Sequence, residues 1–191
     1  MKTELKKLLA ARCKLSIEEP DRVPAAVLVP LYDDGGRYHI VFIRRTQMVK
    51  THKGQISFPG GARESCDRTL QDTAVRESTE EIGLRPEDVD VLGELDDEIT
   101  TTSNYIVTPF VAAMPWPYRF AINAGEVDEV ITVPVRSLLE KGCLAPATEL
   151  LDGMVIDSYT YRYGGHLIWG ATARILYGFL NIIAALQGRP P

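Results

Sequence analysis

The sequence contains little cysteine. Only three cysteines occur among 191 residues, at positions 13, 66 and 143. Their number is odd and no two of them have the C-x2-C spacing, so the sequence predicts neither a zinc site nor a disulfide framework. Reduced thiols suit a cytosolic compartment, and we therefore expect a cytoplasmic protein.

The sequence also lacks a long apolar run. The longest apolar stretch, residues 175–186, is interrupted by Asn181 and is shorter than the roughly 20 residues that cross a bilayer. The first nine residues are too polar, and their apolar run is too short, for a signal peptide. We expect a soluble protein without a membrane partner.

Positive charge and histidine are scarce as well. The chain has 21 lysines and arginines against 26 aspartates and glutamates, which gives a formal net charge of −5. This balance argues against a nucleic acid as the main partner. The three histidines are too few for a histidine-based metal site. One basic cluster fits either a surface loop or a phosphate-binding group; it consists of Arg44, Arg45, Lys50, His52 and Lys53.

The order of the expected elements indicates an α/β fold. The length and a hydrophobic content of 45% suit one globular domain, residues 1–191. Residues 1–20 are expected to form an N-terminal helix and a lead-in, and a C-terminal helix is expected within 165–188. A mixed sheet between helices is the fold that this order predicts. Between the two ends we expect strands at 23–31, 38–45, 89–95, 105–114, 131–135 and 159–163, and a short helix followed by a loop at 136–153.

Three glutamates share one face of a predicted helix. Residues 69–82 contain no proline or glycine and are followed by a glycine, which predicts a helix of about four turns. Glu77, Glu80 and Glu81 stand at i, i+3 and i+4 on it. Like charges at this spacing repel by about 0.2–0.5 kcal/mol per pair. The face is therefore either a solvated acidic surface or a site for a hard divalent cation, which prefers oxygen ligands.

The residues that precede this helix favour the metal site. Gly60 and Gly61 end an apolar, strand-like stretch that closes with Phe58 and Pro59. Glycine allows positive φ and a close approach of the backbone to a ligand. A strand, a glycine turn, a short loop and a helix that carries carboxylates form a cradle for metal and phosphate.

The full spacing resembles a known family motif. From Gly61 the sequence follows G-x5-D-x8-R-E-x2-E-E-x-G-L, which resembles the Nudix box, G-x5-E-x7-R-E-U-x-E-E-x-G-U, where U is aliphatic. Asp67 stands where the box has glutamate, one extra residue precedes Arg76, and Ser78 occupies the aliphatic position. The first two departures also characterise the coenzyme A pyrophosphatase branch of the Nudix hydrolases.

An upstream signature resembles the same branch. Arg45, Gly54 and residues 58–61 match it, whereas Thr46 and Lys50 are substitutions. Lysine is not equivalent to arginine at a position where a planar guanidinium binds a phosphate through two hydrogen bonds. Residues 166–174 resemble the C-terminal segment of the branch, and the whole resemblance extends from about residue 23 to residue 180.

The resemblance implies a Nudix-type α/β/α sandwich with a strand–loop–helix site for Mg²⁺ or Mn²⁺. It makes Glu77 and Glu81 the principal metal ligands, with Glu80 as a ligand or neighbour and the Gly60 carbonyl completing the set. Arg76 is expected to orient the glutamates through an ion pair.

Other site residues are less constrained by the motif. Glu64 and Asp67 are expected to adjust metal binding or to cap the helix, because acidic side chains favour a helix N-terminus. Glu126 is the first candidate for the general base and Glu129 the second, with Asp97 and Glu98 also open. Tyr105, Trp116 and Trp169 could stack on a base but are assigned no role. The residues expected to contact substrate are Arg45, Lys50, Gln55, Ser57 and Gly61.

Together these features predict a divalent-metal-dependent pyrophosphohydrolase. The resemblance implies that it cleaves coenzyme A or an acyl derivative to 3′,5′-ADP and (acyl-)4′-phosphopantetheine. One alternative is the same chemistry on another nucleoside diphosphate derivative, such as ADP-ribose, a dinucleotide or an oxidised nucleotide. Another is a ligand-sensing Nudix-like module that does not cleave. A homodimer is the commonest arrangement for a soluble oligomer.

Overall fold

A mixed β-sheet lies between helices in this chain. The computed structural model describes residues 1–48 and 53–188. Strand β1 (Val23–Asp34) pairs in parallel with β7 (Tyr105–Ala113), and every other pairing in the sheet is antiparallel. The sheet has the strand order β3-β2-β1-β7-β5, with β4 added to β1, β6 to β7 and β8 to β2. Its remaining strands are β2 (Arg37–Arg45), β3 (Ile56–Ser57), β4 (Gly60–Ala62), β5 (Asp90–Glu94), β6 (Glu98–Ile99) and β8 (Val127–Pro134).

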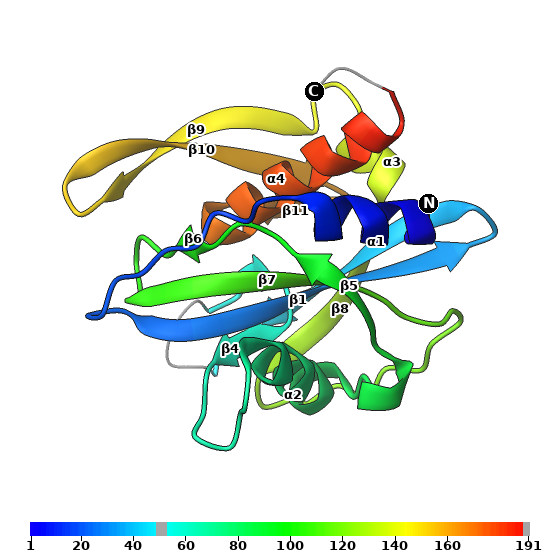
Figure 1. Ribbon diagram of the computed structural model, residues 1–191, viewed down its shortest axis with the longest axis horizontal. Coiled ribbons are helices and arrows are strands. Elements are labelled where there is room, and N and C mark those ends of the chain that lie inside the picture. Colours follow the sequence, from blue (N-terminus) through cyan, green and yellow to red (C-terminus); the bar gives the residue numbers. More distant parts are fainter. Residues whose placement is uncertain (49–52, 189–191) are drawn as a thin grey trace.

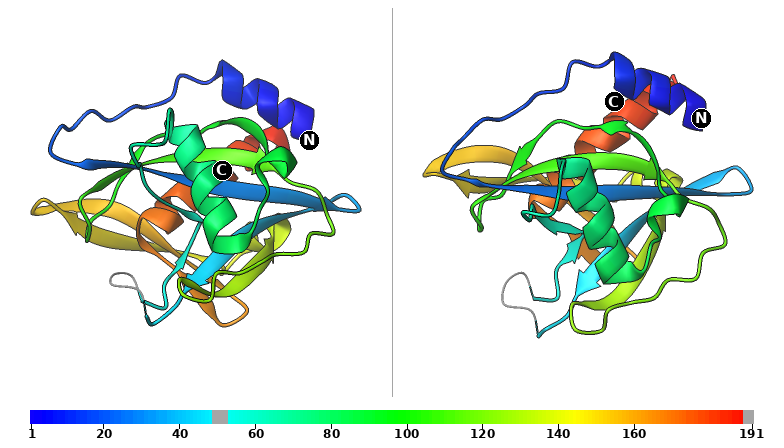
Figure 2. Two further views of the ribbon diagram at one scale, coloured as in Figure 1. Left: turned by 90° about the horizontal axis from the view of Figure 1, so that it is seen from below. Right: turned by 60° about the horizontal axis from the view of Figure 1, so that its bottom comes forward.

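Helices cover both faces of the sheet. Helix α2 (Leu70–Ile82) lies on one face, and α1 (Lys2–Ala11) and α4 (Gly170–Leu186) lie on the other (Figure 1). Viewed from the α2 side, α2 crosses in front of the strands (Figure 2). The predicted α/β sandwich with a mixed central sheet is therefore confirmed. Two short helices complete the set, the 3-10 helix η1 (Pro86–Asp88) and α3 (Val135–Leu138).

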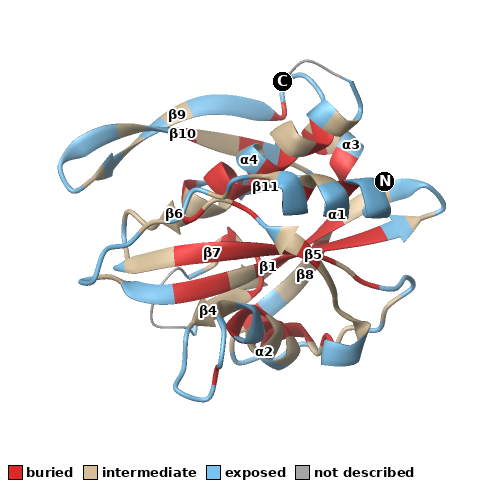
Figure 3. Ribbon diagram, viewed as in Figure 1, coloured by how far each residue is buried: buried red, intermediate tan, exposed pale blue. Residues whose placement is uncertain are grey.

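Alternation along β1 explains how one strand serves two cores. Successive side chains of a strand point to opposite faces of its sheet. Ala25 and Val29 join the cluster that includes α1 and α4, whereas Ala26 and Leu28 join the cluster on the α2 side. The middle of β1 and of β7 is accordingly buried, as the red segments of Figure 3 show.

The C-terminal third differs from the prediction. The loop expected within 136–153 is wrong for β9 (Leu144–Leu151), which pairs with β10 (Met154–Tyr163) over its whole length. The C-terminal helix begins only at Gly170, because β11 (His166–Ile168) pairs with β10. These strands form a second sheet of three, in which much of β9 is exposed (Figure 3). These strands are joined by two-residue turns, Asp152-Gly153 between β9 and β10 and Gly164-Gly165 between β10 and β11. Such dipeptides are local hairpin signals, which the sequence analysis did not use.

No helix among the described residues is long and apolar enough to cross a membrane. The organisation of residues 1–191 as one domain stays a prediction.

Candidate active site

Helix α2 presents its glutamates in a fixed register because both of its ends are capped. Thr69 accepts a hydrogen bond from the Asp72 amide, and the Asp72 carboxylate accepts one from the Thr69 amide, which forms a capping box. At the other end Gly83 adopts the left-handed conformation, with φ 68°. The helix predicted for residues 69–82 is confirmed. The expectation that Glu64 or Asp67 caps it is wrong, because Thr69 does so.

The turn expected at Gly60 and Gly61 is wrong, because both residues lie in β4, which pairs with β1 and brings its backbone against α2. Gly60 has φ 155°, and a Cβ atom there would lie 2.3 Å from the carbonyl oxygen of Ala26 on the paired strand β1. A Cβ atom on Gly61 would lie 2.6 Å from the carboxyl carbon of Glu77. Any side chain at either position would clash, so the two glycines allow β4 to lie against both β1 and α2.

Glu81 is buried at this junction. Its side chain is 1% exposed; Oε2 accepts a hydrogen bond from the Gly60 amide at 3.0 Å, and Oε1 lies 3.2 Å from Arg45 Nη1. Burial raises the pKa of Glu81 to about 8, and repulsion from Glu77 and Glu126 acts in the same direction. Burial of a carboxylate is costly, and a carboxyl group with a raised pKa in a cavity is a candidate functional group.

Glu77 lies one turn before Glu81 on the same face of α2. Burial raises its pKa, opposed by Arg76, whose Nη1 lies 2.9 Å from Glu77 Oε1. Glu80 differs from both neighbours, because its side chain is 55% exposed and it pairs with Arg76 Nη1 at 3.0 Å. The structure therefore brings Glu77 and Glu81 to one cavity and directs Glu80 away from it.

Arg76 acts as the organising cation, as the sequence predicts. Its Nε and Nη2 each lie 3.0 Å from an oxygen of buried Asp67, and Nη2 also donates to the Ala62 carbonyl at 3.1 Å. These hydrogen bonds hold the pKa of the Asp67 carboxyl well below its usual range. The Thr73 hydroxyl donates to Asp67 as well, at 3.0 Å. Asp67 is thus a structural partner of Arg76 that ties the box loop to α2.

A cavity of about 360 Å³ opens beside these carboxylates. Its charged lining residues come from α2, β2 and the loop before β8, and they are Arg45, Glu77, Glu81 and Glu126. Gly60, Gly61, Gln55 and Ser57 also line it.

Most of the residues predicted to contact substrate lie at this cavity. Arg45, Gln55, Ser57 and Gly61 line it, whereas Lys50 lies outside the described residues. The Oγ of Ser57 and the Nε of Arg45 are buried with no hydrogen-bond partner among the described residues. These two groups can accept or donate a hydrogen bond to a ligand.

The rest of the basic cluster lies elsewhere. Arg44 pairs with Asp128 and Glu129, each at 2.9 Å, and does not line the cavity. His52 falls outside the described residues, and Lys53 is exposed. Of the described members of the cluster, Arg45 alone reaches the cavity.

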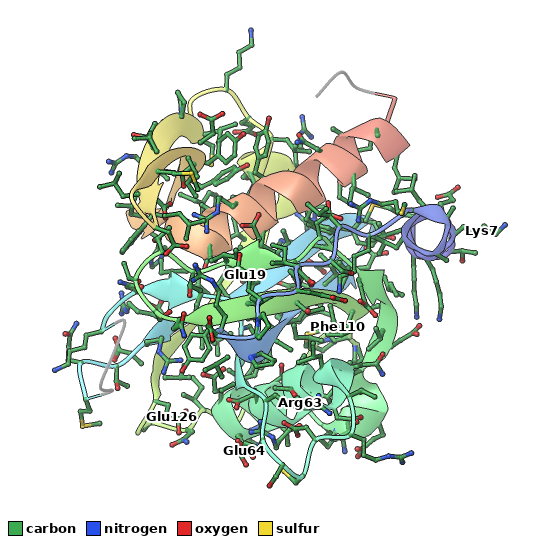
Figure 4. All side chains as sticks on the ribbon, turned by 60° about the vertical axis from the view of Figure 1, so that its left-hand side comes forward. Lys7, Glu19, Arg63, Glu64, Phe110 and Glu126 are labelled. Atoms are coloured by element: carbon green, nitrogen blue, oxygen red, sulfur yellow. The ribbon has the colours of Figure 1, made fainter. Side chains whose placement is uncertain are left out.

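The candidate general bases separate clearly. Glu126 lines the cavity, and its backbone carbonyl accepts a hydrogen bond from the Thr46 amide at 2.9 Å. Figure 4 places Glu126 on the same side of the molecule as Glu64 of the box loop. The rivals are engaged outside the cavity: Glu129 with Arg44, Asp97 with Lys14 and Thr108, and Glu98 with Arg174.

The sequence did not identify the remaining side of the cavity. It consists of residues 100–103, between β6 and β7, and residues 169–172, at the start of α4; we call it the neutral wall. It carries hydroxyl groups and the indole of Trp169 but no charged side chain. The polar run at 100–104 and the unassigned Trp169 were the available signals, and nothing local indicated that they meet.

The chemistry of the donor set fits a divalent cation. Among the described residues no group of three His, Cys, Asp or Glu side chains forms a ready-made metal site. Instead a guanidinium holds each carboxylate of the pair, Arg76 at Glu77 and Arg45 at Glu81. Both carboxylates nevertheless face one cavity, where burial disfavours their charge and repulsion from Glu126 acts in the same direction. Gly61 leaves open the space beside the Glu77 carboxylate. An all-oxygen set of this kind suits Mg²⁺ or Mn²⁺ rather than a softer metal.

Comparison with known proteins gives a consistent result. The family model of the NUDIX domain matches residues 22–153. A protein from Photorhabdus laumondii named "Uncharacterized Nudix hydrolase NudL" is 33% identical over 153 residues, which cover 80% of this chain and 81% of that protein. "Nudix hydrolase 15, mitochondrial" from Arabidopsis thaliana is 32% identical over 184 residues, which cover 91% of this chain and 63% of that protein.

Solved structures share the fold. A MutT/nudix family protein from Enterococcus faecalis superposes with a TM-score of 0.62 at 14% identity, covering 100% of this chain and 77% of that chain. A NUDIX hydrolase from Nitrosomonas europaea gives a TM-score of 0.55 at 15% identity, covering 91% and 77% of the two chains.

Proposed function

Because this chain belongs to the Nudix hydrolase family, we propose that its substrate is coenzyme A or an acyl derivative of it. As a Nudix hydrolase it cleaves a phosphoric anhydride in a nucleoside diphosphate derivative. In the proposed reaction the diphosphate of coenzyme A is hydrolysed to 3′,5′-ADP and (acyl-)4′-phosphopantetheine.

One relationship carries the proposal. Arg45 belongs to the upstream signature that resembles the coenzyme A pyrophosphatase branch, and Glu81 belongs to the box. The Arg45 Nη1 lies 3.2 Å from the Glu81 carboxylate, and both side chains line the same cavity. A residue of the branch-specific signature, Arg45, is therefore paired with a residue of the box that the whole family shares, Glu81.

The residues of the chain divide the work of hydrolysis. Arg45 and Ser57 line the cavity with a guanidinium and a hydroxyl group, which are suited to bind the non-bridging oxygens of the diphosphate. Glu126 is positioned to accept the proton of the attacking water. Arg76 and Asp67 hold α2 and the box loop in place, which fixes the direction of the Glu77 carboxylate.

Glu77 and Glu81 would hold the divalent cation that Nudix hydrolases use, with the Gly60 carbonyl as an additional donor. Glu80, which does not line the cavity, would act through Arg76 rather than as a ligand. When bound, Mg²⁺ or Mn²⁺ neutralises phosphate charge and lowers the pKa of a bound water. The choice of Mg²⁺ or Mn²⁺ belongs to the proposal, as do a cytoplasmic location and a homodimer. The cysteines Cys13, Cys66 and Cys143 are all unpaired, which suits that location.

A specific observation bears on the alternative substrates. Thr46 departs from the upstream signature, yet it does not line the cavity. Its hydroxyl donates to the Gly125 carbonyl at 3.1 Å, and so it anchors the loop that carries Glu126. This departure therefore does not weigh against coenzyme A.

Product analysis tests the proposal. The purified protein is incubated with Mg²⁺ and, separately, with coenzyme A, acetyl-coenzyme A, ADP-ribose, a dinucleotide and an oxidised nucleotide. We expect 3′,5′-ADP from the first two. Cleavage of ADP-ribose or of the dinucleotide with coenzyme A intact would contradict the substrate assignment, and no cleavage of any compound would favour the ligand-sensing module.

A further inference from the structure

The catalytic cavity is divided by charge. Among the described residues, the charged side chains that line it are Arg45, Glu77, Glu81 and Glu126, which come from α2, β2 and the loop before β8. Opposite them the neutral wall, residues 100–103 and 169–172, carries only uncharged side chains. In Figure 1, α2 lies below β1 and β7, whereas β6 and the start of α4 lie above these two strands.

A nucleotide is divided in the same way. Its negative charge resides on the phosphates, whereas the ribose and the base are neutral, and the base presents a flat π-face. The charged side of the cavity suits the diphosphate and a cation. The neutral side suits the nucleoside, because hydroxyl groups both donate and accept hydrogen bonds and an aromatic ring can stack on a base.

Trp169 is the stacking surface that this wall offers. Its side chain is 38% exposed and lines the cavity, whereas Phe58, another aromatic lining residue, is buried. Trp169 lies between β11, which pairs with β10, and the first turn of α4. Because both flanking elements are anchored, the backbone that carries the indole is held beside the cavity.

A buried ion-pair network fixes the rest of the wall. Arg174, on α4, is 8% exposed and lies 2.9 Å from both Glu98 and Glu149. The same guanidinium donates to the Ile99 carbonyl, and the Glu149 carboxylate accepts a hydrogen bond from the Thr101 hydroxyl at 2.9 Å. Helix α4, the hairpin of β9 and β10, and residues 100–103 are thereby held together. The wall is preorganised, which lowers the entropic cost of binding a ligand there.

We propose that the neutral wall is the nucleoside subsite of this enzyme, with the Trp169 indole stacked on the base and Arg174 positioning the wall. The inference rests on the proposed function, because it takes the ligand of the cavity to be a nucleotide. Coenzyme A, ADP-ribose and dinucleotides each contain an adenine nucleoside. In coenzyme A the ribose also carries a 3′-phosphate, which finds no cation in the neutral wall and would extend beyond it.

The test uses adenosine, which has no diphosphate and therefore separates base binding from catalysis. Dissociation constants for adenosine, and for inorganic pyrophosphate with Mg²⁺, are measured by calorimetry on the wild type, Trp169→Ala and Trp169→Phe. Trp116→Phe is the matched control, because Trp116 is 39% exposed, stacks on Tyr32 and does not line the cavity.

We expect Trp169→Ala to weaken adenosine binding about 5- to 150-fold, the factor that corresponds to about 1–3 kcal/mol of stacking. Trp169→Phe should retain most of the affinity, and pyrophosphate should bind all variants equally. If Trp169→Ala fails to fold, Trp116→Phe, which keeps Trp169 as its one tryptophan, should show fluorescence quenching by adenosine.

Either of two kinds of result would overturn the subsite. One is the absence of a Trp169-dependent signal, seen as adenosine affinity within twofold of the wild type in Trp169→Ala or as no quenching in Trp116→Phe. The other is an equal loss of adenosine and pyrophosphate affinity in Trp169→Ala. Adenosine binding that depends on Trp169 supports the subsite even if coenzyme A is not cleaved, so the two proposals fail separately.

Discussion

A Cβ atom added to Gly61 would lie 2.6 Å from the carboxyl carbon of Glu77, so the glycine and the carboxylate are in direct apposition. The φ angle of Gly61 is not in the left-handed region, and the requirement for glycine here is one of space alone.

Gly61→Ala should therefore displace the Glu77 carboxylate. A misplacement of about 1 Å at a catalytic group can lower a rate about 100-fold, while overpacking costs about 1–3 kcal/mol of stability. Steady-state kinetics and thermal unfolding measure the two effects. Gly178→Ala is the control, because nothing lies within 4 Å of the added Cβ; it should gain about 0.5–1 kcal/mol in stability and retain activity. Equal activity of the two variants would contradict the apposition.

Asp67→Asn should destabilise the fold by about 3 kcal/mol, because it removes one partner of a buried ion pair. The folded-state pKa of Asp67 is depressed, so its contribution to stability is complete above the unfolded-state pKa of about 3.9. It is lost as the pH falls below that value. Urea unfolding at several pH values should show a constant difference between wild type and variant from pH 5 to 8 and a smaller difference below pH 4. A difference that grows on acidification would exclude this role.

Glu126→Gln should lower kcat about 10²- to 10⁴-fold, the typical contribution of a general base. Glu129→Gln is its control, because Glu129 lies near in the chain but pairs with Arg44 outside the cavity. Single-turnover rate constants, measured with the diphosphate compound that the wild type hydrolyses, distinguish the two variants. A larger loss in Glu129→Gln would transfer the role of base to that residue.

Arg174→Lys should loosen the neutral wall, since a lysine cannot bridge Glu98, Glu149 and the Ile99 carbonyl as the arginine fork does. We expect KM to rise about 2- to 30-fold, as for residues that couple to a site without contacting the ligand, and kcat to stay within twofold.

Arg44→Lys is the matched control for Arg174→Lys, because Arg44 also pairs with two carboxylates but lies away from the cavity. A fall in kcat with KM unchanged in Arg174→Lys would show that the network acts on catalysis rather than on binding.

Local signals predicted part of this molecule well. The run without proline or glycine at 69–82 and the glycine that follows it located α2, and the strands expected at 23–31 and 38–45 correspond to β1 and β2, because these patterns depend on neighbours in sequence. The box spacing located the Glu77–Glu81 junction for the same reason, since helical periodicity alone puts both side chains on one face.

The hairpin of β9 and β10 was missed although its two-residue turn, Asp152-Gly153, is a local signal. The proline at position 146 in β9 is unusual for a strand and made the segment resemble a loop.

Features that depend on distant contacts were not predicted. The proposed role of Arg174 depends on Glu98 and Glu149, which are 76 and 25 residues away in the chain. The proposed role of Trp169 depends on residues 100–103, which form the neutral wall together with residues 169–172, and sequence periodicity cannot show that these segments lie side by side.

The central claim is that the Glu77 and Glu81 carboxylates hold a divalent cation against the diphosphate. Both can be replaced by glutamine with little change of shape, and a glutamine at position 81 can still accept the Gly60 hydrogen bond. The most direct measurement is the Mg²⁺ dependence of diphosphate hydrolysis in wild type, Glu77→Gln, Glu81→Gln and the control Glu129→Gln. The account predicts at least about a 100-fold loss in the first two variants, with normal thermal unfolding and with Glu129→Gln unaffected. Full turnover in either Glu77→Gln or Glu81→Gln would contradict it.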